Sequence, residues 1–233
     1  AASWTSVATS LDGVRLVVTL SGERIYTSTD SGGSWIGRDS SRSWVSVASS
    51  DNGMNLVAAV QGGQLYTSSN AGTNWTARDS NQSWISVASS GDGSRLAAAF
   101  NANSGAIYLS TDFGTNWVAT SAPTTFWTSV AASADGSCVA AVSDPGGLYL
   151  SEDSGLTWVQ RTALPSNVAW TGVAMSSDAS TIVAVGNPSQ IYVSSQATTT
   201  PGTAGSLRGT RLSAVELVHC GNGVFMPITS QGT

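Results

Sequence analysis

Four acidic side chains fall at positions where they could do acid–base chemistry. They are Glu23, Asp39, Asp79 and Asp144, and all four lie in segments that connect apolar runs. Hydrolysis of a glycosidic bond needs two carboxyl groups about 5–10 Å apart, one to protonate the leaving oxygen and one to attack or to activate water. These residues are therefore the candidate catalytic groups of a carbohydrate hydrolase.

A second set of side chains has the chemistry of a surface that binds sugars or other polar ligands. Tryptophan rings stack on the C–H faces of sugars, and Arg, Asn and Gln form hydrogen bonds with hydroxyl groups. The candidate ligand-binding residues are Arg24, Arg38, Trp44, Arg78, Trp84, Asn101, Asn103, Trp127, Arg161, Trp170, Asn187 and Gln190. The tryptophans also fit a packing role between repeats, and Arg38-Asp39 and Arg78-Asp79 also fit ion pairs between neighbouring sheets.

Other kinds of site have little support. The single histidine, His219, and the two cysteines, Cys138 and Cys220, are too few for a four-ligand Cys/His zinc site. The sequence has no Gly-x-Ser-x-Gly elbow, phosphate loop or dinucleotide fingerprint. We therefore expect no metal and no cofactor. Two cysteines allow one disulfide or none.

The candidate residues belong to a repeat of about forty residues. The segment Trp4-Thr5-Ser6-Val7-Ala8 returns in similar form at Trp44, Trp84, Trp127 and Trp170, at intervals of 40, 40, 43 and 43 residues. A weaker, partial copy starts near Leu212. Each copy continues with an Asp-Gly or Asn-Gly type of turn, an apolar run, a second turn and a run that contains tyrosine.

These runs predict short β-strands. They are rich in Val, Ile, Thr, Tyr and Trp, they are bounded by turn residues, and no stretch has helical periodicity. Consecutive apolar positions, as in Leu56-Val57-Ala58-Ala59-Val60, indicate a sheet that is covered on both faces. Four antiparallel strands in forty residues are typical of one blade of a β-propeller. We therefore expect an all-β fold with a single propeller domain over residues 1–233.

The last part of each of the first four copies carries a specific motif, which breaks down in the fifth copy. Ser28-Thr29-Asp30-Ser31-Gly32-Gly33-Ser34-Trp35 resembles the Asp-box, or BNR, repeat of sialidases and many other β-propellers. The motif recurs over residues 68–75, 110–117 and 151–158. The resemblance implies a structural turn between the third and fourth strands, with these residues as folding devices: Asp30, Asn70 in place of Asp, Asp112 and Asp153.

The resemblance does not extend to sialidase activity. Sialidases carry an Arg-Ile-Pro signature before the first Asp-box, and the nearest string here is Arg24-Ile25-Tyr26, which belongs to the recurring third strand. The expectation is therefore a family-type scaffold without that catalytic centre.

The number of blades is less clear than the type of fold. Six blades, with residues 212–233 as an incomplete last blade, is the favoured prediction. The alternative is five blades with the tail packed as an extra hairpin. In either case the uniform Asp-Gly turns and Asp-boxes lie on one rim. The variable loops and the connections between blades lie on the other rim, where we expect a site because variable loops on a rigid scaffold suggest recognition.

Composition limits the possible partners. The 233 residues include 9 basic and 14 acidic side chains, for a net charge of −5, and all nine basic residues are arginine. Binding to nucleic acid or to an anionic membrane needs concentrated positive charge, so we expect neither. A charged fraction of only 10% favours a secreted protein. The predicted function is non-catalytic binding of glycans or another polar ligand. The alternatives are a carbohydrate hydrolase and a protein-binding scaffold.

Overall fold

The computed structural model describes residues 3–102, 105–161, 168–187, 190–195, 214–219 and 225–231. Regular secondary structure in these ranges consists of strands β1 to β17, with no helix. Accordingly, these ranges hold no helix that is long and apolar enough to cross a membrane.

The fourth repeat shows the blade in its simplest form. Its strands are β9 (Trp127–Ala132), β10 (Val139–Ser143), β11 (Gly147–Ser151) and β12 (Val159–Gln160), and they form an antiparallel sheet in the order β12-β11-β10-β9. The turn between β9 and β10 is the predicted Asp135-Gly136, with Gly136 at φ +65°. Glycine suits this turn because it adopts positive φ without steric cost.

The first three repeats form one continuous sheet of eight strands. The strands are β1 (Trp4–Thr9), β2 (Leu16–Ser28), β3 (Ile36–Ser49), β4 (Leu56–Ser68), β5 (Thr76–Ser89), β6 (Leu96–Phe100), β7 (Ile107–Ser110) and β8 (Val118–Ala119). The outer strand of one blade runs directly into the inner strand of the next blade. Thus the start of β3 pairs with β2, whereas the part of β3 from Trp44 pairs with β4.

The long strands β2 and β4 each contain both middle strands of a blade. The N–H of Ser31 donates to the carbonyl of Val14 at 3.0 Å, so the chain must reverse direction within β2. Gly22, at φ +80°, lies at that reversal. In the third blade the same two segments are the separate strands β6 and β7, which pair antiparallel.

The C-terminal strands belong to the sheet of the fifth repeat. Its sheet has the order β13 (Ala169–Met175), β14 (Thr181–Asn187), β15 (Gln190–Ser195), β16 (Ala214–His219) and β17 (Phe225–Gln231). Instead of starting a sixth sheet, β16 pairs with β15 and takes the fourth position of the fifth sheet. The physical reason is that the free edge of β15 offers unpaired backbone groups that an added strand satisfies.

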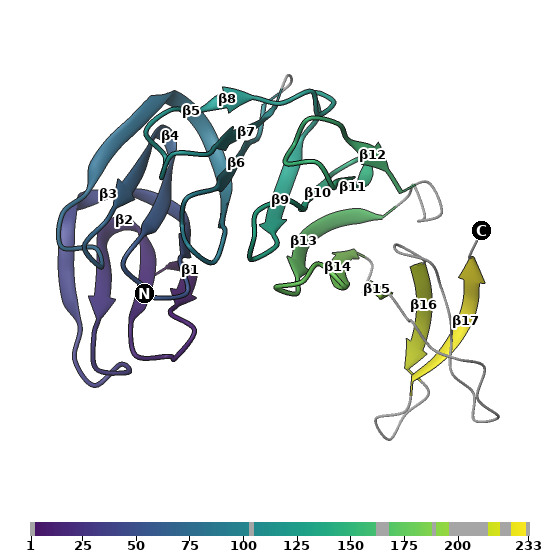
Figure 1. Ribbon diagram of the computed structural model, residues 1–233, viewed down its shortest axis with the longest axis horizontal. Coiled ribbons are helices and arrows are strands. Elements are labelled where there is room, and N and C mark those ends of the chain that lie inside the picture. The colour runs from purple at the N-terminus through teal and green to yellow at the C-terminus, as the bar shows by residue number, and fades with distance from the viewer. Residues whose placement is uncertain are drawn as a thin grey trace.

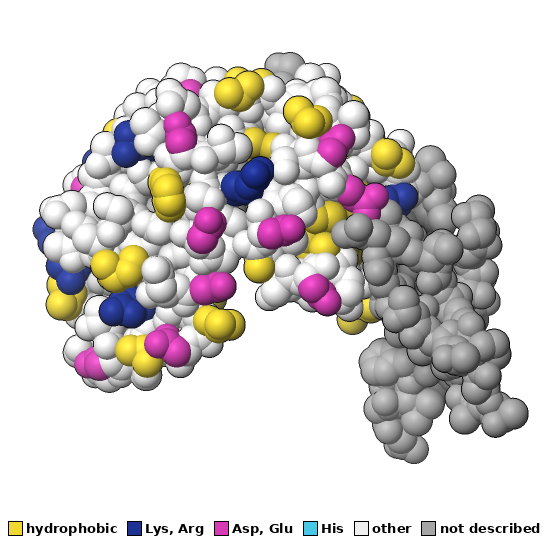
Figure 2. All heavy atoms as spheres, in the orientation of Figure 1, with side chains coloured by type: hydrophobic (Ala, Val, Ile, Leu, Met, Phe, Trp, Pro, Cys, Tyr) yellow, Lys and Arg dark blue, Asp and Glu magenta, His cyan; other side chains and the backbone are white. Residues whose placement is uncertain are grey.

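The sheets follow one another in an arc that does not close (Figure 1). Figure 2 shows that the face in view is mostly neutral, with single acidic and basic side chains scattered over it. We call the rim with the Asp-Gly and Ser-x-Asp-x-Gly turns the turn face, and the opposite rim the loop face.

The core lies between blades, in layers that repeat along the arc. The indole of Trp84 is completely buried and packs with Val57 and Leu65 of the second blade. Trp44, Trp127 and Trp170 are also completely buried, each in the equivalent cluster. Trp4 is 62% exposed, because its face of β1 has no preceding sheet in the described structure. Cys138 is buried in the layer between the last two blades, and Cys220 lies outside the described residues.

Backbone hydrogen bonds on the turn face fix the position of each blade against the next. Leu11 N–H donates to Asp51 O, Asp51 N–H to Gly91 O and Gly91 N–H to Ala134 O, each at 2.7 Å. Ala134 N–H continues the series to Ser177 O at 2.8 Å. Since these residues occupy equivalent repeat positions, the seams between blades share one geometry and can be compared directly.

Candidate functional site

The four predicted catalytic carboxylates all lie on the loop face. Glu23, Asp39, Asp79 and Asp144 are exposed on the loop face, and no hydrogen bond or ion pair joins any two of them within the described residues. The Arg42 guanidinium contacts Asp39 at 3.3 Å and lies 4.5 Å from the centre of the Tyr66 ring. Arg42 was not among the residues that the sequence predicts for a site. Of the four carboxylates, Asp39 is thus the one that an arginine engages in the described residues.

The predicted Arg–Asp ion pairs between blades are wrong. The Nε of Arg38 donates to Thr27 Oγ1 at 3.1 Å, and the Nε of Arg78 donates to Thr67 Oγ1 at 2.9 Å. Asp39 and Asp79 occupy turns at positive φ, 52° and 55°. The two arginines thus cross to the neighbouring strand of their own blade, while the aspartates serve the turn that leads to the next blade.

The predicted tryptophan platforms also need correction. Trp44, Trp84, Trp127 and Trp170 are buried, so they offer no face on which a sugar could stack. Instead, Trp44, Trp84 and Trp127 meet Tyr66, Tyr108 and Tyr149 edge-to-face, with ring centres 5.1, 5.6 and 5.2 Å apart. Aromatic pairs in this geometry stabilise a core beyond the area they bury. The packing role is the one that these positions fulfil.

The other predicted ligand-binding residues are spread along the arc. Arg24 and Asn187 are exposed, Asn101 is half-buried, Gln190 begins β15, and Asn103 lies outside the described residues. Arg161 is half-buried, and burial lowers the pKa of its guanidinium. Its Nε has no partner in the described structure, because Leu150 stands where Thr27 and Thr67 serve the equivalent arginines.

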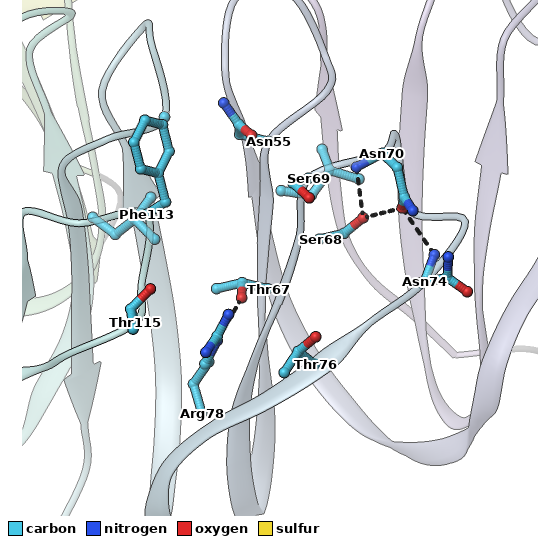
Figure 3. Close-up of a pocket in the computed structure, with 13 residues that line it drawn as sticks. Asn55, Thr67, Ser68, Ser69, Asn70, Asn74, Thr76, Arg78, Phe113 and Thr115 are labelled. Carbon is cyan, nitrogen blue, oxygen red and sulfur yellow. Dashed lines mark hydrogen bonds between the residues drawn. The ribbon is translucent and has the colours of Figure 1, made fainter.

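A pocket of about 140 Å³ lies elsewhere, in the seam between the second and third blades on the turn face (Figure 3). Asn55, Thr67, Asn70 and Arg78 line it from the second blade, and Phe113 and Thr115 line it from the third. Of the predicted ligand-binding residues, only Arg78 takes part. This pocket thus lies on the rim opposite to the one where the sequence predicts a site.

Asn55 opens this pocket. The equivalent positions in the first and third blades are Arg15 and Arg95, whose guanidinium groups cross their seams to Asn52 O at 3.2 Å and to Ser154 Oγ at 3.0 Å. Those two seams hold only about 10 Å³ each. Asn55 also reaches the next blade, with Nδ2 at 3.0 Å from Asp92 O, but its shorter side chain fills less space.

Asn70 removes a negative charge from the pocket without changing the turn. Its Oδ1 accepts from Ser68 Oγ and from Asn74 N–H, both at 2.9 Å. Asp30 makes the same two contacts at 2.7 and 2.9 Å in the first blade, and hydrogen bonds from the Ser34 hydroxyl, the Ser34 N–H and the Ser28 hydroxyl lower its pKa to about 2. The turn at Asn70 thus keeps its geometry and loses a carboxylate that would be ionised.

Arg78 is the only charged residue that lines the pocket. It forms no ion pair in the described part of the chain. The neighbouring carboxylates Asp92 and Asp112 are engaged within their own turns, where serine and backbone groups donate to them. The pocket is therefore a small polar recess with one fixed positive charge. No group of His, Cys, Asp and Glu in the described residues could hold a metal ion.

No known protein family and no curated protein matches this sequence. Solved structures do match. YCF48 bound to D1 peptide is 18% identical with a TM-score of 0.60, over 83% of this chain and 65% of that chain. An ancestral GH74 enzyme is 17% identical with a TM-score of 0.67, over 97% of this chain and 31% of that chain. The GH74 enzyme of Niastella koreensis is 19% identical with a TM-score of 0.63, over 82% and 30%.

The chain thus spans just under two thirds of YCF48 and about a third of the GH74 enzymes. At these identities the likeness concerns the fold. Together with the antiparallel sheets and the layered core, it shows that the chain has an all-β, propeller-type fold.

Proposed function

We propose that this chain is a non-catalytic, secreted binding module of the Asp-box propeller type, and that the seam pocket holds a polar group of its ligand. A single observation carries the proposal. Of the three equivalent seams compared above, one is open, and that one contains Arg78 and no carboxylate. Scaffold positions repeat along the chain, so a local departure that creates a pocket is a candidate for recognition.

A binding role agrees better with this geometry than hydrolysis does. The similar GH74 structures are enzymes, but the pocket described here has no acid and no base. YCF48, the other similar propeller, is bound to a peptide in its structure, which supports a protein-binding or peptide-binding role on this kind of scaffold.

The test is to fill the pocket with the residue that the other seams use. Wild-type protein and Asn55→Arg are applied to peptide and glycan arrays, with Asn187→Arg as the matched control. Asn187 is exposed on the loop face and was itself a predicted ligand residue. We expect ligands that bind wild type and Asn187→Arg but not Asn55→Arg. Binding that Asn187→Arg abolishes and Asn55→Arg preserves would place the site on the loop face and overturn the proposal.

A further inference from the structure

We propose that the seam pocket binds a carboxylate, and that its ligand is a peptide with an acidic side chain or a free C-terminus. This inference rests on the proposed function, since it specifies the chemistry of the same pocket. It follows from a comparison of seams that share one backbone geometry but differ in a few side chains.

Three departures from the repeat coincide at this seam. Asn55 replaces an arginine and opens the space, and Asn70 replaces an aspartate and removes a negative charge. Phe113 stands where the neighbouring repeats have Ala71 and Ser154, and its ring is 51% exposed. Asn55 thus enlarges the pocket, Asn70 makes its electrostatic environment more favourable for an anion, and Phe113 adds an apolar wall.

Arg78 is held ready for an anionic partner. Its Nε donates to Thr67 Oγ1 at 2.9 Å, which fixes the plane of the guanidinium, and Thr67 is itself buried (Figure 3). The Nη atoms form no hydrogen bond with the described residues, so they can donate to a ligand. A guanidinium held in this way suits a carboxylate, because two parallel N–H groups match two oxygens.

The first seam supplies an internal control for this reasoning. Arg38 and Thr27 form the same pair there, at 3.1 Å, but Arg15 fills the seam and Asp30 keeps its charge. An arginine held by a threonine is thus common to two blades. What distinguishes the second seam is that its arginine faces an open recess without an acidic residue.

The size of the pocket favours a peptide over an acidic sugar. Pockets for small-molecule ligands usually enclose about 300–1,000 Å³, against about 140 Å³ here. A carboxylate on a short aliphatic stem fits this space, with the stem against Phe113 and the oxygens toward Arg78. A uronic acid would have to bring its whole ring, with hydroxyl groups on every side, to the same point.

The experiment uses C-terminally amidated nonapeptides with a fixed central residue, which is Glu, Asp, Gln, Asn or Lys, the Gln peptide with a free C-terminus, and a panel of glucuronate-bearing glycans. Binding is measured by fluorescence polarisation at low and moderate salt. We expect Glu or Asp to be preferred over the matched amide by about tenfold or more, with weaker binding at higher salt. Arg78→Gln should remove that preference, whereas Arg38→Gln, which breaks the equivalent Arg–Thr pair in the first seam, should preserve it.

The possible results distinguish failure of the carboxylate proposal from failure of the proposed binding function. Suppose that peptides lose binding to Asn55→Arg, but that wild type prefers neither an acidic central residue nor a free C-terminus over the matched amide. This result would overturn the carboxylate proposal and leave the binding function in place. Glucuronate glycans bound through Arg78, with no acidic peptide bound, would overturn the peptide. Ligands unaffected by Asn55→Arg, or no ligand from either collection, would count against both proposals.

Discussion

Replacing equivalent tryptophans in different blades tests the idea that the stability of this protein resides in the layers between its sheets. Trp84 is completely buried between the second and third blades, and Trp4 is 62% exposed at the open end of the arc. Both begin the first strand of their repeat, so Trp84→Ala and Trp4→Ala remove the same atoms from equivalent positions in similar local sequences. The two variants differ only in what covers the ring.

The expected magnitudes follow from burial. Truncating a buried Trp to Ala in a core costs about 3–5 kcal/mol. This range applies to Trp84, whose ring touches Phe100 and Tyr108 as well as the aliphatic layer. Scaling the same range by the roughly one third of Trp4 that is out of solvent gives about 1–2 kcal/mol.

The assay is urea unfolding followed by far-UV circular dichroism, with the slope of the transition used to check that both variants unfold the same structure. A cost for Trp84→Ala below about 1 kcal/mol would refute the layered core. Equal costs for Trp4→Ala and Trp84→Ala would show that another sheet covers the first blade in solution. If that cost fell on dilution, the covering sheet would come from a second copy of the chain.

Three further predictions concern the turns and the pocket. Hydrogen bonds lower the pKa of Asp30, Asp112 and Asp153 to about 2, from 3.8. The stabilisation from these carboxylates is therefore complete above the unfolded pKa and is lost as pH falls from about 5 toward 2. The melting temperature should fall over that window, less steeply in Asp30→Asn, and a flat profile would contradict the assignment. Gly155→Ala should destabilise the folded protein by about 1–3 kcal/mol, because Gly155 has φ +84° and an added Cβ would collide with Leu109. Gly13→Ala, at φ +70° with open space around it, should cost less stability in the same thermal melts. Equal costs for the two variants would remove the steric argument. Thr67→Val should lower the stability of the fold by about 1 kcal/mol, because it removes the acceptor of Arg78 Nε. The same variant should bind the ligand more weakly in a titration. An unchanged affinity would mean that the orientation of Arg78 is irrelevant to binding.

Local sequence was sufficient for the strands and the turns. Asp135-Gly136 and its relatives marked the inner hairpins, and alternation of apolar runs with turns every ten or so residues marked the strands. These features depend on backbone preferences of neighbouring residues, which a sequence displays directly. The Ser-x-Asp-x-Gly turns were equally readable, since their hydrogen bonds join residues two and four positions apart.

Other features could not be read in this way because they depend on which segments meet. The sheet that the C-terminal strands join could not be read from the sequence, because β16 pairs with β15 between residues about twenty positions apart. The tryptophans could be interpreted as platforms or as core, since the residue type is the same in both roles and only the neighbouring sheet decides the exposure. Asn70 was noticed as a departure from the motif, but its effect on charge has meaning only beside Arg78 and Asn55.

The sequence by itself determined the repeat, its four short strands and the turns that join them, because each of these is specified by residues within one copy. The tertiary structure decided where a ligand could bind. A seam exists only when one blade packs on the next, and the difference between a filled seam and an open one is the length of a single side chain that reaches across it.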